Sequence, residues 1–187
     1  MRLQLFTLAN QLTLLRLALI PFFALATLGQ EPTWALGLFV AAAVSDALDG
    51  LLARLLDQRT PLGAYLDPIA DKLLLSTAFL VLAFRGAVPW PLTILVLGRD
   101  VLIVVIAGVI LLATGFRPFP PTPYGKACTF AETATVLAVL LGGVFAATWL
   151  VSASNFFFWL TATLVVVSGL HYAYRVGKML SELPGKP

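Results

Sequence analysis

The chain has 187 residues, of which 60% are hydrophobic and 11% charged, with a formal net charge of +3 at pH 7. Soluble domains are about 45–50% apolar and about 25% charged, so this composition excludes an ordinary water-soluble globule and indicates that lipid solvates much of the surface. The mild charge on so apolar a chain gives no support to nucleic-acid binding. The length predicts one domain over residues 1–187, and the single cysteine, Cys128, excludes an internal disulfide framework.

Six apolar segments have roughly the 20 residues that cross a bilayer core. We expect them at residues 11–28, 33–56, 68–84, 91–113, 126–150 and 156–176, preceded by an interfacial segment at 1–9. Glycine and proline mark most of the breaks, and the proline-rich stretch 115–123 cannot continue a helix. The polar residues 153–155 mark the last expected break. The sequence therefore predicts an all-α integral membrane protein with six transmembrane helices.

Lysine and arginine near the segment ends gather on one side, whereas the other side holds only Arg85. Because cytoplasmic loops carry an excess of basic residues, we expect both termini in the cytoplasm and the chain in a bacterial inner membrane. The four tryptophans fall near the opposite segment ends, as an aromatic belt would; they are Trp34, Trp90, Trp149 and Trp159.

Four aspartates interrupt the second and third segments, where charge is otherwise avoided. Asp46 and Asp49 are three residues apart, and Asp67 and Asp71 are four apart, so each pair shares one helix face. A short loop makes the two helices antiparallel neighbours, and four converging carboxylates would repel each other strongly at low dielectric. Hard oxygen ligands suit Mg²⁺ or Mn²⁺, and two such ions would balance the four charges. The sequence thus predicts a polar, metal-binding cavity on the cytoplasmic side.

Small residues accompany these acids. Gly50, Ala53 and Gly63 leave room for a bulky ligand to approach the backbone, and Arg54 adds a cation that suits a phosphate. Paired metals beside an arginine favour phosphoryl chemistry.

These positions together resemble the signature of the CDP-alcohol phosphatidyltransferases. The pattern reads Asp46-x2-Asp49-Gly50-x2-Ala53-Arg54-x8-Gly63-x3-Asp67-x3-Asp71. The resemblance implies that Asp46, Asp49 and Asp67 bind the metals, and that Asp71 also lies at the metal site and acts as general base. It implies that the glycines, Ala53 and Arg54 line a pocket for the cytidine diphosphate. It further implies transfer of a phosphatidyl group from CDP-diacylglycerol to an alcohol with release of CMP, and a homodimer.

The acceptor rests on weaker signals. Asn10, Thr13 and Arg16 form a polar stripe that is similar to the start of phosphatidylglycerophosphate synthases, which implies glycerol 3-phosphate as acceptor and places Thr13 at the nucleotide end. The cytoplasmic cations expected to bind an acceptor phosphate are Lys126, Arg117 and Arg175. In contrast, the stretch Gly98-Arg99-Asp100-Val101 resembles cardiolipin synthases, whose acceptor is phosphatidylglycerol.

One interpretation from another functional class remains open. Six helices with buried acids could form a cation transporter, although the sequence shows neither matched halves nor interrupted helices. Arg99, Asp100 and Glu132 are expected to tie helices together by ion pairing, and His171 is expected to lie at the membrane interface.

Overall fold

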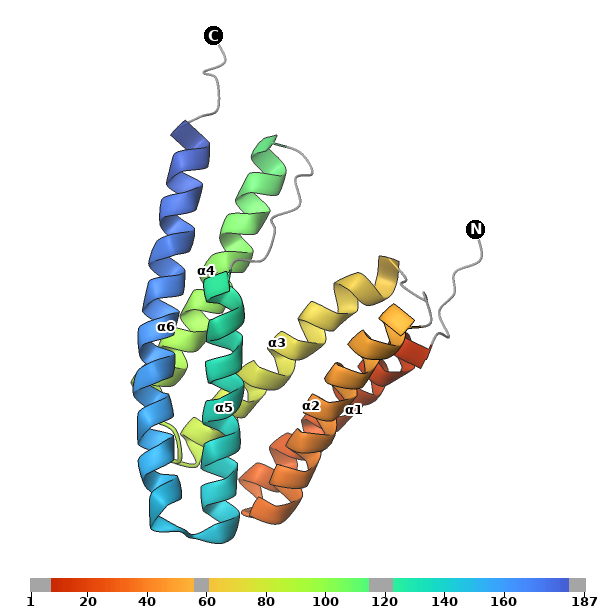
Figure 1. Ribbon diagram of the computed structural model, residues 1–187, viewed down its shortest axis with the longest axis vertical. Coiled ribbons are helices and arrows are strands. Elements are labelled where there is room, and N and C mark those ends of the chain that lie inside the picture. Colours follow the sequence, from red (N-terminus) through yellow and green to blue (C-terminus); the bar gives the residue numbers. More distant parts are fainter. Residues whose placement is uncertain (1–7, 56–60, 115–122, 182–187) are drawn as a thin grey trace.

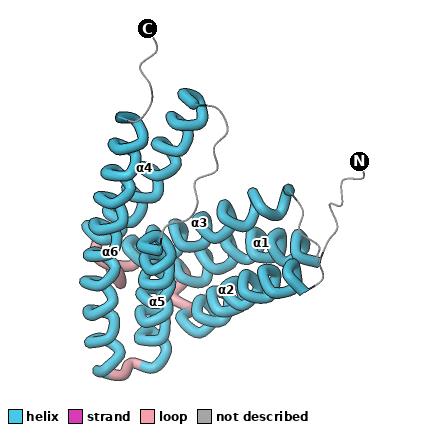
Figure 2. The backbone as a smooth tube through the Cα atoms, turned by 45° about the horizontal axis from the view of Figure 1, so that its top comes forward, coloured by secondary structure: helices cyan, strands magenta, loops and turns pink. Residues whose placement is uncertain are grey.

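A computed structural model of the protein describes residues 8–55, 61–114 and 123–181, and every described element is an α-helix (Figures 1 and 2). The six helices are α1 (Leu8–Leu28), α2 (Pro32–Leu55), α3 (Pro61–Phe84), α4 (Trp90–Thr114), α5 (Pro123–Phe145) and α6 (Thr148–Ser181). The all-α prediction is therefore confirmed. Residues 1–7 of the expected interfacial segment lie outside the described residues.

Tight turns separate the helices where the backbone takes left-handed angles. Gln30 between α1 and α2 has φ 64°, and Gly86 between α3 and α4 has φ 69°. Proline opens α2 at Pro32 and α3 at Pro61, a position that needs no backbone N–H donor. Helix α3 begins seven residues before the predicted start at residue 68, because Pro61 and not Pro68 opens the helix.

The predicted break at 153–155 is wrong. The chain turns at Ala146, with φ 45°, and α6 runs from Thr148 through the polar residues without interruption. The hydroxyl of Ser154 donates to the carbonyl of Leu150 at 2.9 Å within α6 itself. A serine bonded back to its own helix in this way satisfies its polar group and does not end the helix.

The helices pack in two groups joined in the middle. Helix α1 packs along α2 and α3, and helix α6 packs along α5 and α4 (Figure 1). The two groups meet where α5 contacts α2 and α3 and where α3 contacts α4. The shared core is apolar, with the rings of Phe23 and Phe39 5.8 Å apart and Leu75, Phe79 and Val136 buried beside them. This core lies away from the carboxylates and fixes the helices that carry them.

Large apolar side chains also cover the outside. Phe22 on α1, Val104 on α4 and Trp159 on α6 are 60%, 71% and 77% exposed. The part of the chain that the structure describes contains three helices long and apolar enough to cross a membrane, at Gln11–Leu28, Pro123–Phe145 and Thr148–Arg175. Apolar side chains on an outer surface require an apolar solvent, so the chain is an integral membrane protein.

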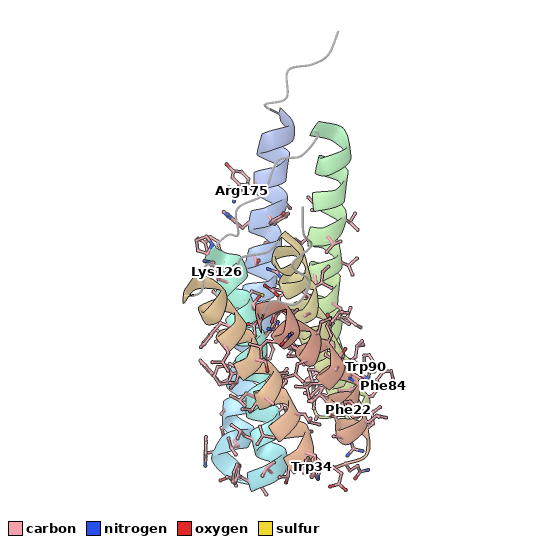
Figure 3. The ribbon with its side chains drawn as sticks, turned by 90° about the vertical axis from the view of Figure 1, so that its right-hand side faces the viewer. Phe22, Trp34, Phe84, Trp90, Lys126 and Arg175 are labelled. Carbon is pink, nitrogen blue, oxygen red and sulfur yellow. The ribbon has the colours of Figure 1, made fainter. Side chains whose placement is uncertain are left out.

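The two ends of the molecule differ in chemistry. Trp34, Phe84 and Trp90 lie toward one end, and Lys126 and Arg175 lie toward the other (Figure 3). A cavity of about 310 Å³ at the aromatic end is lined by residues that include Gln30, Glu31, Arg85 and Gly143. This cavity is not the predicted polar cavity, which was expected at the aspartates.

Candidate functional site

Helix α1 holds one carboxylate from each of its two neighbours. The hydroxyl of Thr13 donates to Asp67 Oδ1 on α3 at 2.6 Å, and Arg16 Nη1 lies 2.7 Å from Asp46 Oδ1 on α2. Both α1 side chains are fully buried. Because Thr13 and Arg16 are three residues apart, they share one face of α1 and reach α3 and α2 from adjacent turns.

Asp71 completes the described part of this site. It lies one helical turn beyond Asp67 on the same face of α3, and it interacts electrostatically with Asp46 on α2 and Arg16 on α1. The acids of α2 and α3 are brought together by α1, which packs against both helices. Carboxylates brought close together repel each other, and Arg16 supplies one compensating charge.

The donor set fits a hard divalent cation. Carboxylate oxygens are the ligands that Mg²⁺ and Mn²⁺ prefer, and the Asp46 side chain is 47% exposed and so accessible. Among the residues that the structure describes, no three His, Cys, Asp or Glu side chains lie close enough to hold a metal ion together. The side chain of Asp49, the fourth predicted ligand, lies outside that described set.

The predicted nucleotide-pocket residues lie on α2 and α3. Gly50, Ala53 and Arg54 lie in the last turns of α2, and Gly63 lies in the first turn of α3. Their side chains fall outside the described part of the structure. Their roles therefore stay predictions, as does that of Arg117, which lies in the segment between α4 and α5.

Two of the predicted acceptor cations share one end of the molecule. Lys126 lies in the first turns of α5 and is exposed, and Arg175 lies on the C-terminal half of α6 (Figure 3). The rings of Tyr124 and His171 are 4.8 Å apart and join the two helices at this level. His171 thus contacts α5, a packing role that the sequence did not predict.

An ionic cluster connects the other helices just beyond Asp71. Lys72 Nζ lies 2.9 Å from Asp100 Oδ1 on α4 and 3.6 Å from Glu132 Oε2 on α5. Arg99 Nη1 lies 2.7 Å from the same oxygen of Asp100, and Arg99 Nη2 donates to Ser168 Oγ on α6 at 3.0 Å. The prediction that Arg99, Asp100 and Glu132 tie helices together is confirmed.

Two contacts of this region were not predicted. Arg16 was placed on a polar stripe but not paired with Asp46, and no partner was predicted for Lys72. The three-residue spacing of Thr13 and Arg16 was the available signal for the contact between Arg16 and Asp46. For the contacts of Lys72, the available signal was the helical period, which directs Lys72 about 100° from Asp71 and toward other helices.

This arrangement defines a class of protein: an all-helical membrane protein with a carboxylate site enclosed by apolar helices. Residues 6–167 match the family described as CDP-alcohol phosphatidyltransferase. The chain belongs to this family, whose members generally use a divalent metal.

Relatives within the family carry two names. A Mycobacterium tuberculosis protein named "Probable phosphatidylglycerophosphate synthase" is 34% identical over 180 residues, covering 90% of this chain and 80% of that protein. A Streptomyces coelicolor "Cardiolipin synthase (CMP-forming)" is 33% identical over 184 residues, covering 93% and 84%. A Mycobacterium bovis "Putative cardiolipin synthase" is 40% identical over 139 residues, covering 73% of this chain, which spans 65% of that relative.

Proposed function

We propose that this chain transfers the phosphatidyl group of CDP-diacylglycerol to an alcohol and releases CMP, as a step of phospholipid biosynthesis. The observation that carries the proposal is the pair of contacts from α1, in which Thr13 and Arg16 hold Asp67 and Asp46. These contacts support a site at which carboxylates of α2 and α3 act together with Asp71. Membership of the family supports the reaction class.

In this proposal Asp46, Asp49, Asp67 and Asp71 hold two Mg²⁺ or Mn²⁺ ions. Bound there, the ions would offset negative charge on the phosphoryl oxygens and on the departing CMP. Asp71 takes the proton from the acceptor hydroxyl, because a neutral alcohol is a poor nucleophile. The acceptor oxygen then forms a bond to the phosphorus that carries the lipid, and the bond from that phosphorus to the CMP oxygen breaks.

The other predicted residues receive the substrates. Gly50, Ala53 and Gly63 leave space for the cytidine diphosphate, Arg54 binds its phosphates, and Thr13 orients Asp67 beside it. The acyl chains of the donor leave sideways between helices into the bilayer. This path explains why an enzyme that acts on small polar head groups consists almost wholly of apolar helices.

Glycerol 3-phosphate is the acceptor we favour, with phosphatidylglycerophosphate as product. Its phosphate would bind Lys126 and Arg175 at the basic end of α5 and α6, together with Arg117. The polar stripe of α1 and the relative named phosphatidylglycerophosphate synthase, which covers 90% of this chain, support this choice. Phosphatidylglycerol is the second candidate, supported by the resemblance of the stretch Gly98-Arg99-Asp100-Val101 to cardiolipin synthases and by the relatives with that name.

We also propose a topology and an assembly. All six helices of the single domain cross a bacterial inner membrane, with the polar cavity and both termini on the cytoplasmic side and residues 1–9 along the interface. Lys126 and Arg175 at one end and the exposed tryptophans at the other support this orientation. The enzyme works as a homodimer, a proposal that rests on the family resemblance alone.

The decisive experiment is an acceptor panel. The purified protein is incubated with CDP-diacylglycerol, Mg²⁺ or Mn²⁺, and one of glycerol 3-phosphate, phosphatidylglycerol, inositol phosphate or serine. CMP and the lipid product are both measured. We expect CMP release with glycerol 3-phosphate; a lipid product with phosphatidylglycerol alone would move the assignment to cardiolipin synthesis. If no alcohol elicits metal-dependent CMP release, and liposomes carrying the protein pass Mn²⁺, the chain is a cation transporter.

A further inference from the structure

Lys72 follows Asp71 directly on α3, and its side chain reaches two other helices. Asp71 interacts electrostatically with Asp46 and Arg16 on one side and with Lys72 and Glu132 on the other. Lys72 itself forms ion pairs with Asp100 on α4 and Glu132 on α5. Successive helical residues project about 100° apart, so the position of one side chain determines the direction of the next. Fixing Lys72 therefore fixes the rotation of α3 at the turn that carries Asp71.

Among the described side chains of α3, the large buried apolar ones begin one turn beyond Asp71. They start at Leu74 and continue with Leu75 and Phe79 toward the aromatic end. Among the described side chains before Leu74, Ala70 is the buried apolar one, and its methyl group offers little shape to resist rotation or sliding. The polar contacts of Lys72 therefore help to hold this turn, together with the hydrogen bond from Thr13 to Asp67.

The partners of Lys72 are themselves held. Asp100 Oδ1 is shared between Lys72 and Arg99, and Arg99 is anchored to Ser168 on α6. Glu132 has no solvent exposure, and it accepts the thiol hydrogen of Cys128 at 3.2 Å. Buried charged groups keep to their partners because a buried charge without one is costly. The lysine is thus held by acids on α4 and α5, and Arg99 connects this pair to α6.

The charges of the cluster cancel. Lys72 and Arg99 are cations, and Asp100 and Glu132 are acids, so the set is neutral by pairing. A neutral, internally paired set offers no net attraction for another metal ion or for a phosphate. Its chemistry suits mechanical positioning better than binding.

We propose that Lys72, held by Asp100 and Glu132, is a positioning residue that sets the direction of the Asp71 carboxylate toward the metal-binding carboxylates. The inference rests on the proposed function, because it assigns Asp71 to the site. The inference goes beyond the proposed function because it makes α4, α5 and α6 contribute, through Lys72, to the geometry of the carboxylate site.

The test compares Lys72→Met, which keeps the apolar stem and removes the charge, with Lys72→Arg, which keeps a cation. Groups that orient metal ligands typically contribute 10–100-fold to metal affinity or activity. We expect Lys72→Met to lower kcat for CMP release by about 10–100-fold and to weaken Mn²⁺ binding, measured by electron paramagnetic resonance, by a similar factor. Lys72→Arg should recover most of both losses.

Asp100→Asn provides an independent variant of nearly unchanged shape. It should reduce kcat and Mn²⁺ affinity in the same direction but less, since Glu132 remains. Combined with Lys72→Met it should add no further loss, because the two side chains act as one unit. Arg85→Met, which removes a cation at the aromatic end, is the matched control and should change neither quantity.

Thermal unfolding in detergent separates positioning from loss of fold. Unchanged kcat and Mn²⁺ affinity in Lys72→Met would overturn the proposal. Losses that Lys72→Arg does not restore would also overturn it, as would losses that are fully explained by a smaller folded fraction of the Lys72→Met protein. If the wild-type protein binds Mn²⁺ but releases no CMP, the proposed function fails. The Mn²⁺ affinities would then still decide whether Lys72 positions the carboxylate site.

Discussion

The hydrogen bond from Thr13 to Asp67 is the contact best suited to a quantitative test. Thr13→Val replaces the hydroxyl by a methyl group of nearly equal size at a fully buried position, so the packing of α1 is kept. At 2.6 Å the hydroxyl donates to a carboxylate oxygen, and hydrogen bonds to charged groups contribute about 1.5–3 kcal/mol. Asp67 is only partly buried, so water replaces some of the loss, and the lower value of about 1.5 kcal/mol applies.

That energy corresponds to about a tenfold change in a rate or binding constant. We expect Thr13→Val to lower kcat for CMP release about tenfold and to raise the Mn²⁺ concentration needed for half-maximal rate, because Asp67 is no longer held toward the site. Thr13→Ser keeps the donor and should stay close to wild type.

The matched control is Thr27→Val on the same helix. Thr27 is also buried, but its hydroxyl bonds to the carbonyl of Phe23 within α1, at 2.8 Å and away from the carboxylates. Its loss should leave turnover and metal dependence unchanged. If Thr13→Val matches Thr27→Val in both quantities, the hydrogen bond does not orient Asp67 for catalysis, and the reasoning fails.

Three further predictions follow from the site. Asp71→Asn should lower turnover by about 10²–10⁴-fold while CDP-diacylglycerol binding largely survives, with Asp57→Asn as a control outside the aspartate pattern; near-normal turnover would remove Asp71 from the role of base. A chelator should abolish CMP release, and Mg²⁺ or Mn²⁺ should restore it better than Zn²⁺, since the ligands are carboxylate oxygens; activity that persists in the chelator would contradict the metal site. Lys126→Met should raise KM for glycerol 3-phosphate about tenfold through loss of a charged hydrogen bond and leave KM for CDP-diacylglycerol unchanged; the opposite pattern would place Lys126 at the donor.

The sequence was sufficient for the helices where local chemistry marks their ends. Pro32 and Gly86 stand at real breaks, because a proline suits a first helical turn and a glycine accepts a positive φ. The prediction from sequence failed between α5 and α6, because the residue at the turn is Ala146 and an alanine does not mark the end of a helix. The polar Ser154 wrongly indicated a helix end, since its hydroxyl is satisfied by a hydrogen bond inside α6.

The candidate site was predictable in its residues but not in its contacts. Spacing places Asp67 and Asp71 on one face of α3 without knowledge of the fold. The partner of Asp46 was not predictable, because Arg16 is 30 residues away and meets it only when α1 packs on α2. The same holds for Lys72, whose two acidic partners come from helices far along the chain. Helical periodicity gives the direction of a side chain, whereas tertiary packing decides what it meets.

Helix α6 has a physical consequence for the bilayer around it. Its apolar stretch, Thr148–Arg175, has 28 residues, which is about 42 Å of helix against a hydrocarbon core of about 30 Å. Absorbing that excess by tilt alone would need an inclination of about 45°, beyond the 0–40° range seen for membrane helices. Part of the helix therefore stands in the headgroup layer, and the depth of Arg175 depends on membrane thickness. A thicker membrane draws that guanidinium closer to the hydrocarbon edge, and a thinner one lifts it toward water. If Arg175 binds the acceptor phosphate as proposed, lipid composition then adjusts the depth at which it does so.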